Sequence, residues 1–191
     1  MRAASRTGNA APLADPTRRT PTAIHVCSLD RIWDTIERER PSHLITLLHD
    51  DGIVPTPAKI ETAHHLRISM HDISVPQPGM VHPSDVHIER ILAFVAAWDR
   101  ASPMVVHCLA GISRSTATAF IAACALNPGA DEAQIAQRIR QLSPTASPNM
   151  RLVELADDRL QRQGRMIEAI ETIGRGELAM EGHPFALPAH W

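Results

Sequence analysis

The sequence predicts an α/β fold in which helices flank a central, mainly parallel sheet, in a single domain. Short apolar segments alternate with amphipathic helical patterns in the first half of the chain, and helical patterns cluster in the second half, which is typical of a sheet covered by helices. A length of 191 residues allows one domain with a sizeable core, and no second full domain is expected. We expect residues 1–22 to be a disordered leader, residues 23–175 to form the domain, and residues 176–191 to be a C-terminal tail.

Four apolar segments in the first 107 residues have the length and the residue types of β-strands. Residues 66–70 alternate between apolar and polar side chains, as a half-buried strand does. Residues 104–107 are too apolar for a solvent-facing edge, so we place this strand at the centre of the sheet. The four expected strands are residues 23–27 (AIHVC), 43–48 (HLITLL), 66–70 (LRISM) and 104–107 (MVVH).

Helices are expected between these strands where a capping residue precedes an apolar stripe. Ser28 can cap a helix that Pro41 ends, and Ser84 can cap a second amphipathic helix. A short helix is also expected at residues 59–65. The segment 73–83 (ISVPQPGMVHP) carries three prolines and a glycine, so we expect an irregular loop there.

Four more helices are expected in the second half of the chain. The first is largely apolar and should be buried, and the Asn-Pro-Gly sequence at 127–129 stops it. Ser-Pro at 143–144 ends the second, and Asn149 is a good cap for the third. The expected helices are residues 115–126, a helix striped by Ile135, Ile139 and Leu142, a helix from Asn149 to Leu160, and residues 165–173.

Composition and charge argue against several classes of function. Nineteen basic residues against 21 acidic ones give a formal net charge of -2, so neither a nucleic acid nor a membrane is expected as a partner. No apolar run approaches a membrane span, and the N-terminus lacks the apolar core of a signal peptide. Cys27, Cys108 and Cys124 show no repeated spacing, which fits a reducing compartment, and the cytoplasm is the expected location. The 11 histidines lack metal-ligand spacing, so no metal or other cofactor is expected.

One segment, residues 105–116 (VVHCLAGISRST), joins the expected central strand to the expected buried helix. A tight loop at a helix N-terminus can turn its backbone amides inward and form an anion site. Gly111 tolerates backbone angles that a Cβ resists, and the Arg114 guanidinium matches two oxygens of a phosphate. The expected phosphate ligands are the amides of Leu109, Ala110, Gly111, Ile112, Ser113 and Arg114.

The same donors would stabilise a thiolate at Cys108. A helix N-terminus and a nearby cation favour the ionised thiol, so we expect Cys108 to be an anion at neutral pH and a nucleophile toward phosphorus. Ser115 is placed to hydrogen-bond the sulfur as it leaves, and His107 is expected to orient the loop. His71 and Asp72 also follow an expected parallel strand, at the sheet edge where ligands bind.

The segment HCLAGISRST resembles the signature loop of the cysteine-dependent protein tyrosine phosphatase superfamily, His-Cys-x5-Arg-Ser/Thr. The segment SPTASPNMRLVELAD resembles the dual-specificity branch, where a Pro-Asn pair starts a helix after the signature. The segment HLRISMHDISVPQPGMVHPSDVHIERILAFVAAW has the shape of the family's strand, acid loop and helix. The similarity covers roughly residues 23–160, and it is greatest to small bacterial tyrosine phosphatases.

The resemblance implies a phosphatase-like fold and a hydrolase that works through a phosphocysteine intermediate. Cys108 would be the nucleophile, and Arg114 would bind the phosphate and the transition state. The family also needs an upstream aspartate that protonates the leaving oxygen. Asp72 is the first candidate, Asp85 in the first turn of an expected helix is the second, and the aspartates at 50–51 are the third.

The implied substrate is a phosphorylated protein or a small phosphomonoester, with phosphotyrosine expected first and dual specificity second. The variable loop positions carry no Lys or His, which makes inositol lipids less suitable. Trp33, Phe94 and Trp98 lie on helical stripes and are expected in the core. A catalytically weak phosphate-binding module that uses the same loop is the alternative function. A sulfurtransferase or an arsenate reductase fits less well, because rhodanese-type loops usually place the Arg one residue closer to the Cys.

Overall fold

The structure, a computed structural model, describes residues 22–49 and 54–191. The predicted leader lies outside the described residues except for its last residue, and the third candidates for the acid, Asp50 and Asp51, lie outside them too. None of the helices in these two ranges has the length and apolar character that a bilayer span requires.

A five-stranded sheet forms the centre of the fold. Its strands in chain order are β1 (Ala23–Cys27), β2 (His43–Leu48), β3 (His65–Ser69), β4 (Met104–His107) and β5 (Phe185–Pro188). The order across the sheet is β3-β2-β4-β1-β5, in which the first four strands are parallel and β5 is antiparallel to β1. All four residues of β4 are buried, which confirms the predicted central position of this strand.

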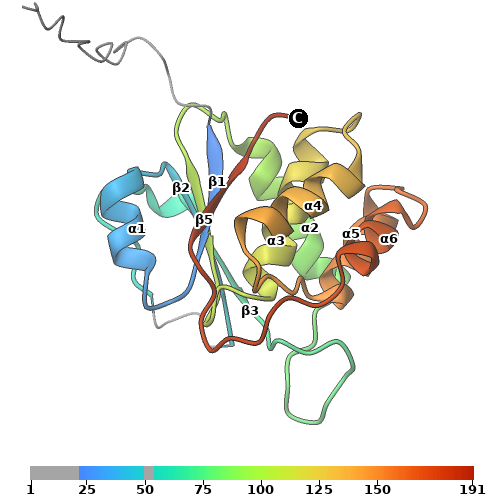
Figure 1. Cartoon of the computed structure of the whole chain (residues 1–191). Helices are drawn as coiled ribbons and strands as arrows, with labels where there is room; N and C mark the ends of the chain where they lie inside the picture. The colour runs from blue at the N-terminus through green and yellow to red at the C-terminus, as the bar shows by residue number, and fades with distance from the viewer. Residues whose placement is uncertain (1–21, 50–53) are drawn as a thin grey trace, which may run out of the picture.

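Helices cover both faces of the sheet (Figure 1). In chain order they are α1 (Ile32–Glu39), α2 (Asp85–Ala97), α3 (Arg114–Leu126), α4 (Glu132–Leu142), α5 (Met150–Arg159) and α6 (Arg165–Ile173). Helix α1 lies on one face over a small cluster of buried side chains that includes Ile32, Leu44 and Val105. The other helices pack on the opposite face around a larger core, and α3 is buried along almost its whole length. The predicted α/β class is therefore confirmed.

Two local predictions on the α1 side of the sheet are wrong. The helix expected at residues 59–65 is a single 3-10 turn, η1 (Thr62–His64), because His65 pairs in register with Leu44 and already belongs to β3. Trp33 was expected in the core but is 49% exposed, because α1 turns Ile32 and Thr35 inward instead.

The C-terminal segment, predicted as a tail, contributes the fifth strand. Strand β5 pairs with β1 from Ala23 opposite Pro188 to Val26 opposite Phe185. Pro184 precedes this strand and Pro188 ends it, a pattern that argues against a central strand but is tolerated at an edge. The pairing covers an edge of β1 that would otherwise be open.

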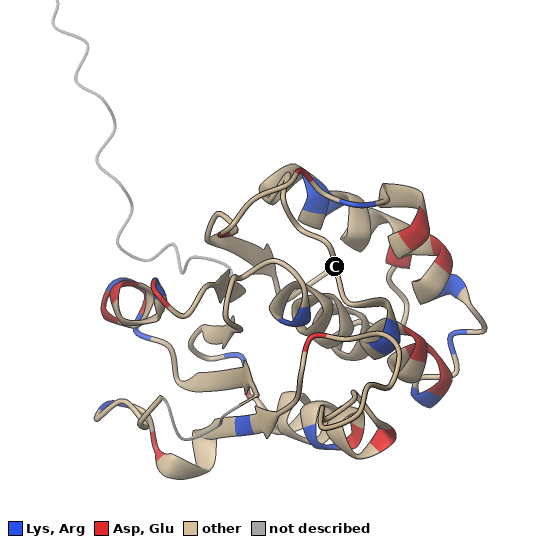
Figure 2. Ribbon diagram, turned by 90° about the horizontal axis from the view of Figure 1, so that it is seen from below, with Lys and Arg blue, Asp and Glu red and all other residues tan. Residues whose placement is uncertain are grey.

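The carboxyl ends of the parallel strands point to one end of the molecule, where the loops after β1, β3 and β4 gather (Figure 1). The segment 73–83 projects there as an irregular loop, as predicted. Seen from this end, Lys and Arg positions are mixed with Asp and Glu positions over the helices (Figure 2). This end of the sheet holds the predicted site residues.

Candidate active site

Three backbone hydrogen bonds join the loop between β4 and α3, residues 108–113, to the segments around it. The amide of Leu29 donates to the carbonyl of Leu109 (3.0 Å), that of Gly182 to the carbonyl of Ala110 (2.8 Å), and that of Ser147 to the carbonyl of Ile112 (2.9 Å). The C=O of one residue and the N–H of the next point in opposite directions within one planar peptide. The amides of Ala110, Gly111 and Ser113 are therefore turned toward the interior of the loop.

The loop amides are left without backbone acceptors. Of the amides of residues 109–114, only that of Gly111 donates a hydrogen bond to another described residue, and its acceptor is Cys108 Sγ at 3.3 Å. The five other N–H groups remain available to an anion. This is the arrangement that the sequence predicts for a phosphate cradle.

Two glycines allow the loop to pack this closely. Gly111 has a φ of +72°, and a Cβ there would lie 2.8 Å from the Ser28 nitrogen and 2.9 Å from the Cys27 carbonyl carbon. A Cβ on Gly182 would lie 2.6 Å from the Gly111 oxygen. A side chain at either position would push the loop away from β1 or from the C-terminal segment.

Cys108 is buried, yet its sulfur contacts hydrogen-bond donors. The residue is 1% exposed, and its Sγ lies 3.1 Å from Ser115 Oγ and 3.3 Å from the Gly111 nitrogen. The Ser115 hydroxyl is thus where the sequence predicts it. The sulfur faces the polar side of the loop.

His107 is a neutral, buried member of a hydrogen-bonded chain. Thr46 Oγ1 lies 2.8 Å from His107 Nε2 and 2.9 Å from His65 Nε2. His65 Nδ1 lies 3.1 Å from Thr56 Oγ1, which accepts a hydrogen bond from Arg67. Burial lowers the pKa of His107 and the pKa of His65 to about 4. His107 therefore adds no positive charge to the loop at neutral pH. Its hydrogen bond with Thr46 fixes the end of β4, where the loop begins.

Arg114 is buried with part of its guanidinium unpaired. It is 6% exposed, and its Nη1 donates to the Met70 carbonyl at 2.8 Å. Its buried Nε has no hydrogen-bond acceptor among the described residues and lies 3.8 Å from Asp72 Oδ2. A buried donor without a partner is uncommon in proteins. An oxyanion in the loop would supply the missing acceptor.

Asp72 lies beside the loop. Its Oδ1 accepts hydrogen bonds from Ser113 Oγ (2.7 Å) and Asn149 Nδ2 (2.8 Å), and its side chain is 35% exposed. Asp85, the second candidate for the acid, is the exposed first residue of α2, and no hydrogen bond or ion pair joins it to the loop within the described ranges. The geometry thus brings Asp72, and not Asp85, into contact with the loop.

Asn149 is a site residue that the sequence predicted only as a helix cap. Its Oδ1 accepts from the Leu152 amide at 3.2 Å and so caps α5, while its Nδ2 donates to Asp72. Its backbone amide also donates to the Ser113 carbonyl at 3.4 Å. The Pro-Asn pair marked the residue in the sequence, but nothing there linked it to an aspartate 77 positions earlier.

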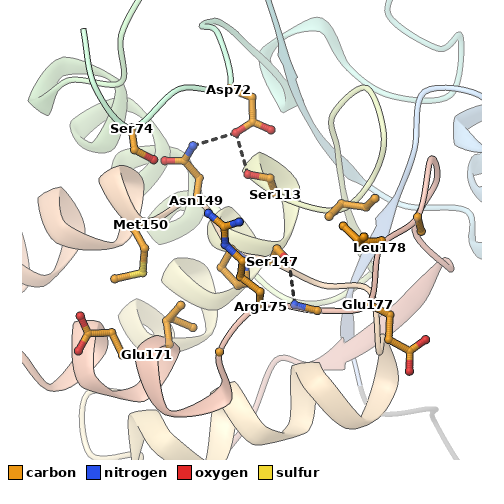
Figure 3. A pocket seen from close by; sticks show the side chains of 16 residues that line it. Asp72, Ser74, Ser113, Ser147, Asn149, Met150, Glu171, Arg175, Glu177 and Leu178 are labelled. Atoms are coloured by element: carbon orange, nitrogen blue, oxygen red, sulfur yellow. Dashed lines mark hydrogen bonds between the residues drawn. The ribbon is translucent and has the colours of Figure 1, made fainter.

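A groove of about 530 Å³ adjoins the loop (Figure 3). Its walls come from the loop, from residues 147–150 and from residues 174–179 after α6. The hydrogen-bonded group of Asp72, Ser113 and Asn149 forms one corner of the groove (Figure 3). The groove therefore continues directly from the Cys108 loop.

The remaining cysteines lie in the core. Cys27 and Cys124 are free and buried, and burial raises the pKa of each thiol to about 12. No group of three His, Cys, Asp or Glu side chains is arranged to hold a metal ion in residues 22–49 and 54–191.

One protein family model matches part of the chain. The family model for protein-tyrosine phosphatases matches residues 64–146, which include Asp72 and the whole Cys108 loop. No curated protein matches the chain in sequence.

Solved phosphatase structures share the fold. Human DUSP28 is 20% identical with a TM-score of 0.56, and the match covers 73% of this chain and 94% of that one. A mouse putative dual specificity phosphatase, complexed with zinc tungstate, is 19% identical with a TM-score of 0.54, covering 85% and 98%. The PTP-2 phosphatase of Cydia pomonella is 16% identical with a TM-score of 0.55, covering 73% and 90%. Over residues 64–146 the chain matches the protein-tyrosine phosphatase family model, and its fold is the one found in the solved phosphatase structures.

Proposed function

We propose that the chain is a cysteine-dependent phosphatase that hydrolyses phosphomonoesters, phosphotyrosine in proteins first, through a phosphocysteine intermediate. The observation that carries the proposal is the geometry of the 108–114 segment. Unpaired amides turn inward, the Cys108 sulfur contacts donors, and the buried Arg114 Nε lacks an acceptor. These groups suit a tetrahedral dianion held next to a nucleophilic sulfur.

In the first step, the Cys108 thiolate attacks phosphorus while the bond from phosphorus to the leaving oxygen breaks. The loop amides and Arg114 bind the other three phosphate oxygens and stabilise the transition state. Asp72 gives its proton to the leaving oxygen, so that the alcohol or phenol departs neutral. Ser113 and Asn149 orient the Asp72 carboxyl group through the hydrogen bonds to Oδ1.

In the second step, water attacks the phosphocysteine and Asp72, now ionised, accepts a proton from that water. The bond between phosphorus and sulfur breaks, inorganic phosphate forms, and the thiolate is restored. Ser115 Oγ, 3.1 Å from Sγ, donates a hydrogen bond to the departing sulfur. His107 stays neutral throughout and holds the start of the loop.

Two further observations support the expected ligand, a tetrahedral oxyanion, and the expected compartment. The mouse relative holds tungstate, a tetrahedral oxyanion like phosphate, and we expect tungstate to compete with substrate in this chain. The three cysteines are free, which suits a reducing compartment, and the cytoplasm remains our prediction.

The test is turnover of p-nitrophenyl phosphate and of matched phosphotyrosine, phosphoserine and phosphothreonine peptides. We expect hydrolysis of the aryl phosphate and the phosphotyrosine peptide, with inhibition by vanadate and by tungstate. Tungstate binding without turnover of any ester would instead support the phosphate-binding module. Turnover of thiosulfate, or of arsenate with added thiol, in place of the esters would support a sulfurtransferase or an arsenate reductase.

A further inference from the structure

Exposed apolar side chains gather around the proposed active site. Among the described residues, nine large hydrophobic side chains are exposed, and six of these lie on three segments next to the Cys108 loop or in it. We call these six the apolar rim: Val75, Met80 and Val81 in segment 73–83, Leu109 in the loop itself, and Leu178 and Met180 after α6. Leu178 and Met180 are almost fully exposed, at 104% and 95%. Apolar side chains concentrated in this way mark a surface that binds something.

Backbone hydrogen bonds hold the rim segments beside the loop. The His71 amide donates to the Val81 carbonyl at 2.9 Å, and the Val81 amide donates to His71 Nδ1 at 2.9 Å, which keeps the end of segment 73–83 next to Asp72. The Gly182 amide donates to the Ala110 carbonyl at 2.8 Å and anchors the segment that carries Met180. The rim therefore borders the phosphate loop.

The groove beside the loop has apolar walls on the same side. Ile112, Met150, Ile170 and Leu178 line it together with Asp72 (Figure 3). Its volume of about 530 Å³ is larger than one side chain and within the usual range of ligand pockets. A polypeptide whose phosphate occupies the loop has neighbouring residues at the opening of this groove.

The charges of the groove disfavour an anionic occupant. Arg175, whose side chain points into the groove, is the one cation among its lining residues, and the carboxylates of Glu171 and Glu177 lie at its edge (Figure 3). Segment 73–83 contains no charged residue, and its ribbon is uncoloured in Figure 2. An acidic peptide flank or an anionic lipid surface would find a single cation, Arg175, among the residues that line the groove. A neutral apolar flank needs no cation.

We propose that the groove and the apolar rim select phosphoproteins in which apolar residues flank the phosphorylated side chain. This inference rests on the proposed phosphatase function and names its substrate class. Contact between the rim and an apolar flank removes apolar surface from water on both partners, which a polar flank does not do. The phosphate loop then supplies the chemistry, and the rim supplies the preference among phosphoproteins.

The experiment compares three phosphotyrosine peptides that differ only within three residues of the phosphotyrosine, where they carry leucine, serine or glutamate. With p-nitrophenyl phosphate as the reference, kcat/KM for the leucine peptide should exceed that for the serine peptide by about tenfold or more. The glutamate peptide should be no better than the serine peptide. Equal values for leucine and serine, or a preference for glutamate, would overturn the inference.

A double variant in the apolar rim and a distant control test whether the rim causes the preference for the leucine peptide. Leu178→Ser combined with Met180→Ser should lower the leucine-to-serine ratio toward one. The control is Trp191→Ser, which removes a 40% exposed apolar side chain at the opposite end of the sheet, beyond Pro188 (Figure 1). The control should keep the wild-type ratio. A ratio that survives the double variant, or falls equally in the control, contradicts the assignment to the rim.

Vesicles that contain a phosphorylated lipid test the alternative that a membrane, rather than a peptide, contacts the rim. Faster hydrolysis of such vesicles than of the leucine peptide would replace the peptide flank with a membrane as the occupant. Activity on p-nitrophenyl phosphate without a peptide preference overturns only this inference. Inactivity on p-nitrophenyl phosphate and on every peptide overturns the proposed function as well.

Discussion

Cys108 and Cys124 are two buried thiols, one just before helix α3 and one inside it. Both are 1% exposed. Cys108 Sγ contacts the Ser115 hydroxyl and the Gly111 amide, in a loop whose other amides lack backbone acceptors. Both side chains belong to the large buried cluster, and at Cys124 burial raises the pKa of the thiol to about 12.

The two thiols are equally buried, so the groups in contact with each sulfur are what distinguishes them. Burial among apolar groups disfavours the charged thiolate, whereas burial among unpaired donors compensates the charge. The donors next to Cys108 exist because the loop carbonyls are bonded elsewhere, which turns the amides inward. The following four predictions, in order of decreasing effect, test the proposed roles of Cys108 and of the residues around it.

Exchange of the proposed nucleophile should have the largest effect. Cys108→Ser should lower kcat by about 10⁴-fold or more, because a hydroxyl is a far weaker nucleophile than a thiolate. Calorimetric titration should still detect tungstate binding, since the loop amides remain. Cys124→Ala should keep kcat within about twofold. Near-wild-type turnover in Cys108→Ser would exclude this residue as the nucleophile.

Loss of the guanidinium fork should have the next largest effect. Arg114→Lys keeps a positive charge but cannot bind two oxygens at once, so kcat/KM should fall by about 10²- to 10³-fold. The matched control is Arg138→Lys on the exposed side of α4, which should leave kcat/KM unchanged. A loss below about fivefold in Arg114→Lys would argue against bidentate binding of phosphate.

Removal of the proposed general acid should have an effect that depends on the leaving group. Asp72→Asn should lower kcat by about 10²-fold for phenyl phosphate, whose leaving oxygen needs a proton, and by much less for an ester with a very acidic leaving group. The decrease in rate at higher pH that comes from ionisation of this carboxyl group should also disappear from the pH–rate profile. Asp85→Asn is the control and should behave as wild type. The opposite pattern would make Asp85 the acid.

The smallest predicted effect is on stability, through the neutral histidines behind the loop. Because the pKa values of His65 and His107 are lowered to about 4 in the folded state, the unfolded chain binds more protons than the folded chain between about pH 6.5 and pH 4. The free energy of unfolding should therefore decrease as the pH falls through this range, by at most about 1.4 kcal/mol per pH unit for each histidine.

Urea denaturation at pH 7, 6 and 5 measures this slope. His65→Gln should make the pH dependence shallower, whereas His190→Gln, an exposed control near the C-terminus, should leave it unchanged. A slope that is the same in wild type and in His65→Gln would show that His65 does not titrate as its burial indicates.

Local patterns predicted most of the secondary structure, because caps, apolar periodicity and prolines act within a few residues. Asn149 caps α5 and the segment 127–129 ends α3, as expected. The prediction failed where a distant partner decided the outcome. β5 forms because β1 offers an open edge, and Trp33 is exposed because α1 presents a different face to the sheet.

The sequence by itself determined which residues the loop brings together. Cys108, Gly111 and Arg114 lie within seven consecutive residues between a buried strand and a helix, and the same segment supplies the amides. Such short-range geometry depends on few backbone angles, so residue spacing is enough to predict it.

Only the tertiary structure decided which distant groups support the loop. Asn149 reaches Asp72, Gly182 reaches Ala110, and Thr46 joins His65 to His107, each across a long stretch of chain. The groove and the apolar rim arise in the same way, from segments brought together by the packing of the whole core. These contacts depend on how every element packs against the sheet, and no local pattern in the chain encodes that packing.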